Sequence, residues 1–342
     1  MRAVALAILA ASCMPPSWGA GALLHPRRKP VEIVPALAHR DVVVEGGGAT
    51  LRGWLFPAED PSAGTTIVYL HGSADNRASG LWIAERLVRA GYDVLAYDSR
   101  AHGESGGEAC TYGYHEKRDL SRALDALGVT RAVLVGASLG AAVALQAAAE
   151  DPRVVAVVAA ATFSDLETVA RERAPWFASE GQIQEAMAIA EREGRFQVAA
   201  VSPVLAARRI RVPVLLVHGA DDAETPPAHA ERVLAALAGP GRLLAVPGAG
   251  HADALGRAWT QVERWIAAVA PRGPGPPGPD RPGSPVHPVR RSGRRPPRPK
   301  PAGGPATAAA RRTSRRAPRS PGSRRGSTAG AAPSSPSRRR RA

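Results

Sequence analysis

The stretch VLVGASLGAAVAL, Val133 to Leu145, decides the fold. Its first half is a β-branched apolar run typical of a buried strand, and its second half is typical of a helix. Between them lies Gly136-Ala137-Ser138-Leu139-Gly140, in which each glycine removes a side chain that would collide in a sharp strand-to-helix turn. This context predicts that Ser138 is a nucleophile raised above the sheet. The alternative is an ordinary glycine-rich turn.

The chain around this stretch alternates strand-like and helix-like segments from about Asp41 to Ala270. Because the apolar runs do not alternate with polar residues, the pattern predicts an α/β domain with a mostly parallel sheet, flanking helices and right-handed crossovers. The segment from Asp165 to Pro203 is helical in character and interrupts the rhythm, so we expect a small helical lid over a ligand crevice, or else an extra pair of packed helices. The expected strands are Asp41–Glu45, Leu51–Phe56, Thr65–Leu70, Asp93–Tyr97, Ala132–Val135, Val154–Ala160 and Val212–Val217, and the expected helices include Leu81–Ala90, Tyr114–Leu127 and Leu139–Ala149.

A serine hydroxyl needs a base and an orienting carboxylate to become a nucleophile, and in this arrangement they follow the serine in the order acid, then histidine. His251 comes after the short strand and glycine-rich loop LAVPGAGH, where it can reach Ser138. The strand in VLLVHGADD ends in Asp221 and Asp222, and the spacing alone does not choose between them.

Acyl transfer also needs donors for the negative charge that develops on the carbonyl oxygen. One expected donor is the backbone N–H of Leu139, which follows the nucleophile. The other is the backbone N–H of Ser73, in the His71-Gly72-Ser73 loop after the strand that ends at Leu70. We expect His71 itself to be a packed, hydrogen-bonded structural residue. No metal or cofactor is expected, since no His/Cys cluster has ligand spacing and the two cysteines, Cys13 and Cys110, make no disulfide framework.

The two ends of the chain differ in composition from the middle. Residues 1–24 begin with one arginine and an apolar run, which predicts a signal peptide or N-terminal anchor, with Ala11-Ser12-Cys13 as a loose lipoprotein site. Export is therefore expected, and the alternative is an apolar N-terminus of a cytoplasmic protein. Residues 271–342 are rich in Pro, Arg and Ser and predict a disordered tail. From Arg272 this tail holds 19 Arg and Lys and one acidic residue, so the remainder, with 26 basic and 29 acidic residues, is mildly acidic.

Several motifs together resemble the α/β-hydrolase superfamily over roughly Asp41 to Ala270: HGSADNR, YDSRAHGESGG, GASLG, VLLVHGADDAETP and GAGH. The resemblance is to the dienelactone-hydrolase-like and serine-aminopeptidase-like bacterial group. It implies the α/β-hydrolase fold, a Ser138–Asp222–His251 triad and no cofactor. It favours Asp222 over Asp221 because the family acid lies three residues after the His218-Gly219 pair.

These features predict a serine hydrolase that cleaves ester-type bonds, most simply a carboxylesterase for small to medium acyl substrates. Peptidase or thioesterase activity is the enzymatic alternative, and a peptidase would need a carboxylate such as Glu180 or Glu185 for the free amino terminus of a peptide. An alternative of another class is a binding module whose basic tail contacts nucleic acid or an anionic membrane. The lack of aromatic residues and of a repeated motif in the tail favours a segment without such a role.

Overall fold

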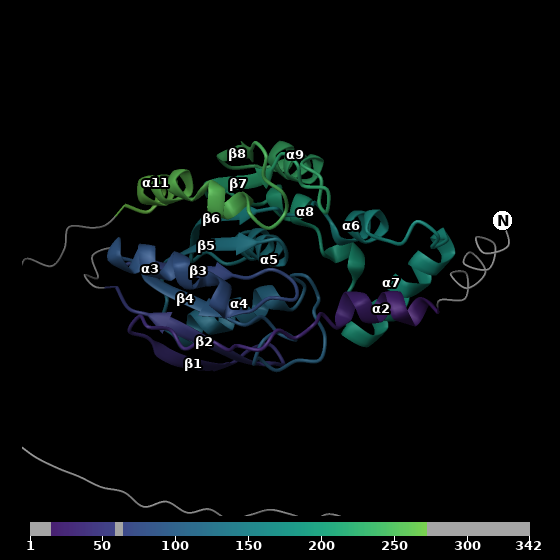
Figure 1. Cartoon of the computed structure of the whole chain (residues 1–342), viewed down its shortest axis with the longest axis horizontal. Helices are drawn as coiled ribbons and strands as arrows, with labels where there is room; N and C mark the ends of the chain where they lie inside the picture. Colours follow the sequence, from purple (N-terminus) through teal and green to yellow (C-terminus); the bar gives the residue numbers. More distant parts are fainter. Residues whose placement is uncertain (1–14, 59–63, 272–342) are drawn as a thin grey trace, which may run out of the picture. The chain divides into compact units, whose positions relative to one another are not determined.

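The computed structural model describes residues 15–58 and 64–271, and its centre is one eight-stranded sheet (Figure 1). The strand order is β1-β2-β4-β3-β5-β6-β7-β8; β1 and β2 are antiparallel, β2 is antiparallel to β4, and all the other pairs are parallel. The predicted mostly parallel α/β sheet is confirmed. The strands are β1 (Arg40–Glu45), β2 (Thr50–Phe56), β3 (Thr66–Leu70), β4 (Asp93–Tyr97), β5 (Ala132–Ala137), β6 (Val154–Ala160), β7 (Val214–Gly219) and β8 (Gly241–Val246).

Helices cover both faces of the sheet, which explains the unbroken apolar strands. Side chains of β3 alternate between two cores: Val68 and Leu70 pack with α4 and α5, whereas Ile67 and Tyr69 pack with α3 and α11. A parallel sheet buried on both faces needs this apolar lining. The helices of this part are α3 (Leu81–Arg89), α4 (Glu116–Ala126), α5 (Leu139–Ala148), α8 (Pro203–Ala207), α9 (Ala228–Ala236), α10 (Ala254–Arg257) and α11 (Trp259–Val269), with a short 3-10 turn η1 (Arg77–Gly80).

Several strand boundaries differ from expectation by one or two residues, and two of the differences have a clear physical reason. Strand β7 begins at Val214 rather than Val212, because Pro213 has no N–H to donate to a neighbouring strand, although its carbonyl accepts the N–H of Val157 at 3.0 Å. Strand β8 begins at Gly241, three residues before Leu244, and its pattern is mostly exposed or half-buried. An edge strand of this kind lacks the apolar signal that identifies central strands.

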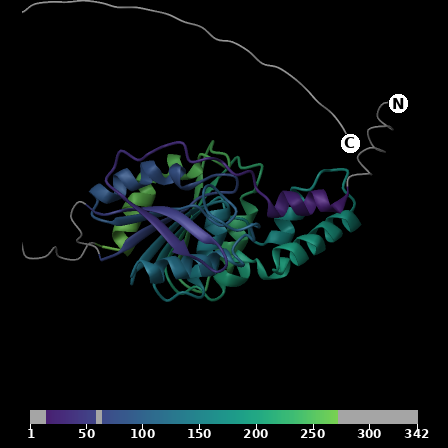
Figure 2. The same cartoon turned by 90° about the horizontal axis from the view of Figure 1, so that it is seen from below.

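The helical lid is confirmed as a cap of α6 (Leu166–Glu172), α7 (Glu180–Gly194) and the 3-10 turn η2 (Val198–Ala200), and it has one unexpected member. Helix α2 (Pro16–Leu24) lies beside α7 (Figures 1 and 2). Ala20 and Leu24 are fully buried in a small core that they share with Met187, Ala190 and Phe196 of the cap. Gly19 permits this close approach, since a Cβ there would lie 3.0 Å from the Cβ of Ala186.

Helix α2 is tied to the rest of the fold at its C-terminal end. The carbonyl of Leu24 accepts the N–H of Cys110 at 2.8 Å, and Arg28 donates to the carbonyls of Ser105 and Gly107 at 2.5 and 2.7 Å. Residues 16–24, which the composition assigns to a leader, are therefore packed against the cap. The leader prediction for residues 1–14 and the tail prediction for residues 272–342 lie outside the described residues. No described helix combines the length and the apolar character needed to cross a bilayer.

Candidate active site

Ser138 sits at the turn between β5 and α5 with a backbone that residues other than glycine rarely adopt. Its φ is 51° and its ψ is −111°, and its N–H donates to the carbonyl of Ala160 at 2.8 Å. A residue with a side chain is strained in this region of backbone angles, so the surrounding structure must hold it there. The two glycines of the motif explain how: a Cβ on Gly136 would lie 2.3 Å from the carbonyl oxygen of Gly140, and one on Gly140 would lie 2.0 Å from that of Leu70.

Replacing Gly140 with alanine is expected to destabilise the fold by about 3 kcal/mol, because the added methyl group meets rigid backbone and the turn must move. Urea unfolding followed by circular dichroism measures this effect. The matched control is Gly256→Ala in α10, where a Cβ meets nothing within 4 Å, so a small gain of about 0.5 kcal/mol is expected. Equal stability of the two variants would contradict the close packing of the turn.

The structure brings the three predicted triad residues together. The Oγ of Ser138 lies 2.9 Å from Nε2 of His251, and Nδ1 of His251 lies 2.8 Å from Oδ2 of Asp222. Because a carboxylate only accepts, the proton of the neutral ring is on Nδ1, and Nε2 is the acceptor for the serine hydroxyl. This is the tautomer that a general base requires.

The structure also distinguishes the two aspartates. Asp222 is buried, and its Oδ1 accepts the N–H groups of Glu224 and Thr225 at 3.0 and 2.8 Å. Its Oδ2 lies 2.8 Å from Nδ1 of His251 and 3.3 Å from Nε2 of the buried His218. Asp221 is exposed, and its backbone N–H bonds to the carbonyl of Ala249 at 3.0 Å. Geometry therefore selects Asp222 as the partner of the histidine.

The two expected oxyanion donors are next to the serine in the fold. Leu139 opens α5, and Gly72 lies so close to Ser138 that a Cβ on it would be 3.7 Å from the serine Cβ. Within residues 15–58 and 64–271, neither the N–H of Leu139 nor that of Ser73 has a hydrogen-bond acceptor. Both groups are therefore available to a carbonyl oxygen.

His71 fixes the direction of the Ser73 N–H. Its Nε2 accepts the N–H of Ser99 at 2.9 Å, so its Nδ1 carries the proton and donates to the carbonyl of Gly72 at 2.7 Å. In a trans peptide the C=O and the following N–H point in opposite directions, so this bond turns the N–H of Ser73 away from the imidazole. Burial lowers the pKa of His71, which keeps the ring neutral. The sequence predicts a structural histidine here but not this effect on the donor.

Two of the sequence motifs support each other through a buried ion pair. Arg77 of HGSADNR donates through Nη1 to Oδ2 of Asp98 at 2.5 Å, and its backbone N–H bonds to Oδ1 of the same carboxylate at 2.7 Å. Its Nη2 reaches Glu104 of AHGESGG at 2.6 Å. The loop that carries Ser73 is thus clamped to the loop after β4, and each of the two motifs holds the other in place.

A second serine–histidine contact lies under the cap. Nδ1 of His229 is 2.9 Å from the Oγ of Ser164, and its Nε2 is 2.6 Å from Glu172. Both Ser164 and His229 are fully buried, and Nδ1 also accepts the backbone N–H of Ser164 at 3.1 Å. A serine without access to solvent or to a cavity cannot attack a substrate, so this contact joins α6 to α9 rather than forming a second active site.

A cavity of about 360 Å³ lies between α2, α6 and α7 and includes Ser73 in its wall. This volume is in the range of small-molecule sites. Most of the lining is apolar, and residues 15–23 form one wall, contributed by Pro15, Pro16, Gly19, Ala22 and Leu23. Neither Glu180 nor Glu185 is among the lining residues, and Glu180 is paired with Arg171. The hypothetical site for a peptide amino terminus is therefore not formed by these two carboxylates.

Comparisons with known proteins agree with this fold. A family model described as the alpha/beta hydrolase fold matches residues 65–186, and one described as TAP-like protein matches residues 192–264. The uncharacterized protein Rv2307c of Mycobacterium tuberculosis is 31% identical over 221 residues, which are 63% of this chain and 73% of that protein.

Solved structures show the same likeness at the level of the fold. The Pyrococcus furiosus esterase Pf2001 has a TM-score of 0.59 at 22% identity and covers 72% of this chain and 99% of its own. The Pyrococcus horikoshii acylaminoacyl peptidase has a TM-score of 0.55 at 14% identity and covers 69% of this chain and 43% of its own. Because the family model, the relative in Mycobacterium and the shared architecture agree, the chain belongs to the α/β-hydrolase family.

Proposed function

We propose that this hydrolase is a serine carboxylesterase that cleaves esters of small to medium acyl chains through an acyl-enzyme. The observation that carries the proposal is the continuous hydrogen-bond chain from Ser138 through His251 to Asp222, with distances of 2.9 and 2.8 Å. A nucleophile, a base in the correct tautomer and an orienting acid are the components that acyl transfer needs.

The first half of the reaction follows from these contacts. The Oγ of Ser138 attacks the ester carbonyl while Nε2 of His251 takes its proton, and Asp222 stabilises the imidazolium that forms. The negative charge on the former carbonyl oxygen is stabilised by the N–H groups of Ser73 and Leu139. As the tetrahedral intermediate collapses, the C–O bond to the alcohol breaks, and His251 gives its proton to the leaving oxygen.

Hydrolysis of the acyl-enzyme by water completes the cycle, with water in the place of the serine as nucleophile. His251 takes a proton from water, the resulting hydroxide equivalent attacks the acyl carbon, and the second tetrahedral intermediate expels Ser138, which recovers its proton from His251. The products are a carboxylic acid and the free enzyme. None of these steps calls on a cofactor.

The cavity supports an ester with an apolar acyl chain. Its wall carries Leu23, Leu166, Val169, Ile183 and Met187, and apolar surface of this kind favours a hydrocarbon chain over a peptide backbone, whose amide groups would lose their hydrogen bonds to water. A thioester would present the same chain and react by the same route, so thioesterase activity is the second candidate.

Active-site labelling combined with ester hydrolysis tests the proposal. The protein is expected to hydrolyse p-nitrophenyl butyrate with a burst of about one equivalent of p-nitrophenol, and a fluorophosphonate is expected to abolish turnover while modifying one serine. Peptide mass spectrometry should locate the adduct on Ser138. Turnover that survives complete labelling, or an adduct on Ser164 instead, would contradict the assignment.

A further inference from the structure

The cavity described above is apolar except for four side chains, and one of these carries a charge. The polar members are Ser73, Tyr112, Arg173 and Gln182, of which Arg173 is the only ionised residue. Arg173 is exposed, so its charge is hydrated at the mouth of the cavity, and its hydrogen-bond partners decide whether it can also bind an anion there.

Arg173, at the C-terminal end of α6, is anchored but not neutralised. Its Nε donates to the carbonyl of Glu224 at 3.1 Å and its Nη2 donates to Oγ1 of Thr225 at 2.6 Å. In the described parts of the chain, no carboxylate lies within ion-pair distance of it, and Nη1 has no hydrogen-bond partner. Two neutral acceptors therefore fix the guanidinium in place and leave its positive charge for a ligand.

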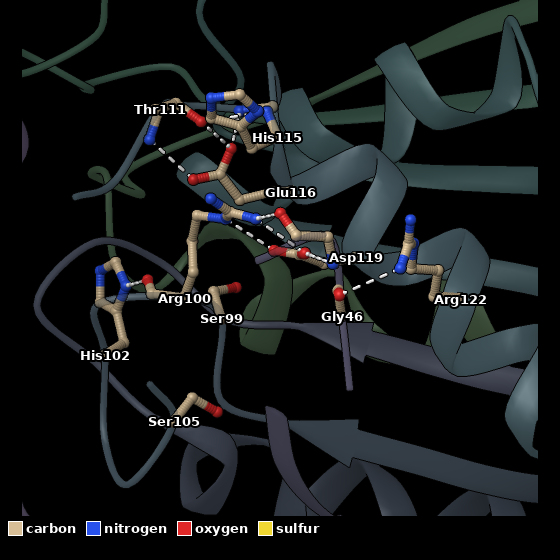
Figure 3. A network of polar contacts seen from close by, with 12 residues as sticks. Gly46, Ser99, Arg100, His102, Ser105, Thr111, His115, Glu116, Asp119 and Arg122 are labelled. Carbon is tan, nitrogen blue, oxygen red and sulfur yellow. Dashed lines mark hydrogen bonds and ion pairs between the residues drawn. The ribbon is translucent and has the colours of Figure 1, made fainter. Parts of the chain in front are cut away.

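Tyr112 is presented to the same cavity by a strained segment. Its φ is 55°, and its carbonyl accepts the side-chain amide of Gln146 at 2.9 Å. On either side of it, the N–H groups of Thr111 and Gly113 each donate to the buried carboxylate of Glu116 at 2.7 Å. Figure 3 shows the bond between Thr111 and Glu116. A conformation so fully determined by its neighbours, at a cavity wall, indicates a functional constraint on the side chain.

The hydrogen-bond network in Figure 3 connects that segment to α4 and to the end of β4. Glu116 begins α4, and one turn later Asp119 accepts both Nε and Nη2 of Arg100 at 2.6 and 2.8 Å. Arg100 follows β4, so the pair joins the helix that carries Glu116 to the sheet. This buried bidentate pair fixes α4, and with it Glu116, against the end of the sheet.

The Tyr112 hydroxyl and the Arg173 guanidinium can both donate hydrogen bonds into the cavity, and no charged acceptor lines the cavity beside them. The Tyr112 hydroxyl has no hydrogen bond to another described residue. Burial raises the pKa of Tyr112, so its O–H remains a donor at neutral pH, and Tyr112 and Arg173 line the same cavity. A neutral donor beside a cationic donor is complementary to an anion.

We propose that Tyr112 and Arg173 bind a carboxylate at the far end of the acyl chain, so that the preferred substrates are esters of dicarboxylic acids with one free carboxylate. The inference rests on the esterase function proposed above. The apolar wall then contacts the methylene groups, and the charged end of the chain is held between the hydroxyl and the guanidinium. The reaction at the ester carbonyl is unchanged.

Matched ester pairs test this proposal in the full-length protein. The mono-p-nitrophenyl esters of adipic and suberic acid are compared with p-nitrophenyl hexanoate and octanoate, which have the same chain lengths without the charge. The wild-type protein is expected to show a higher kcat/KM for the charged member of at least one pair, mainly through a lower KM, and added salt should reduce the difference.

Variants separate this role from a structural one. Arg173→Gln is expected to lower the charged-to-neutral ratio of kcat/KM about tenfold and Tyr112→Phe about fivefold, the size expected for charge-assisted hydrogen bonds in a partly open site. Arg173→Lys should keep part of the preference. Because Arg173 also holds Thr225, its loss lowers kcat for both members of a pair, and the ratio removes that shared effect.

The matched control is Arg171→Gln, which removes the same charge from α6 at a residue that pairs with Glu167 and Glu180 and does not line the cavity. Its ratio should equal that of the wild type. Hydrolysis of the neutral esters without any preference for the charged ones, or an unchanged ratio in Arg173→Gln, would overturn the inference alone. Failure to hydrolyse either member of every pair would instead count against the esterase function.

Discussion

Replacing Ser138 with alanine is expected to lower kcat for p-nitrophenyl butyrate by about 10⁶-fold, the size of effect that removal of a triad serine has in a serine protease. The reason is that no other described hydroxyl is both accessible and hydrogen-bonded to a histidine side chain: Ser138 is half-buried, and its Oγ is 2.9 Å from Nε2 of His251. The measurement is steady-state release of p-nitrophenol, with circular dichroism to show that the variant is folded.

Ser164→Ala is the matched control for this experiment. Ser164 makes a contact of the same length to a histidine, but it is fully buried and serves to join α6 to α9. Its loss should lower stability slightly and leave kcat within a fewfold of the wild type. A large loss of activity in Ser164→Ala with normal folding would contradict the assignment of Ser138 as the nucleophile.

Replacing Asp222 with asparagine is expected to lower kcat by about 10⁴-fold, with little change in KM. The amide can donate to Nδ1 of His251, which would favour the tautomer whose proton is on Nε2, and this ring cannot accept the proton of Ser138. Assays over a range of pH separate the effect on kcat from a change in the protonation of the base.

Asp221→Asn is the control, because it makes the same chemical change one residue away. Asp221 is exposed and its backbone, rather than its carboxylate, is bonded within the turn. Activity close to that of the wild type is expected. The opposite result, with Asp221→Asn inactive and Asp222→Asn active, would mean that in solution the turn after β7 brings Asp221 rather than Asp222 to His251.

The sequence predicts most of the sheet and the triad because both depend on local signals. Unbroken apolar runs identify the central strands, and the glycines around Ser138 have a steric reason that is visible in the motif. The choice between Asp221 and Asp222 needs three dimensions, since it depends on which carboxylate the turn buries. The family resemblance favours the same residue as the geometry.

The lining of the cavity could not be predicted in the same way. Tyr112, Arg173 and α2 are far apart in the sequence, and none belongs to a repeated or catalytic motif. Tyr112 is placed by a carboxylate, Glu116, whose role depends on burial, and the apolar composition of residues 16–24 reads equally as part of a leader. These features depend on tertiary contacts, which a short sequence pattern does not predict.

Because α2 forms one wall of the cavity, a form of the protein without residues 15–24 would accept different acyl chains from a form that retains them. A cleavage before Pro15 retains Gly19, Ala22 and Leu23 in the cavity wall, whereas one after Leu24 removes that wall and uncovers Met187 and Phe196 of the small cap core. Two proteolytic forms of one gene product would then share a triad and differ in the acyl chains they accept. Proteolysis at this end of the chain would thus change the substrate preference and leave the catalytic mechanism unchanged.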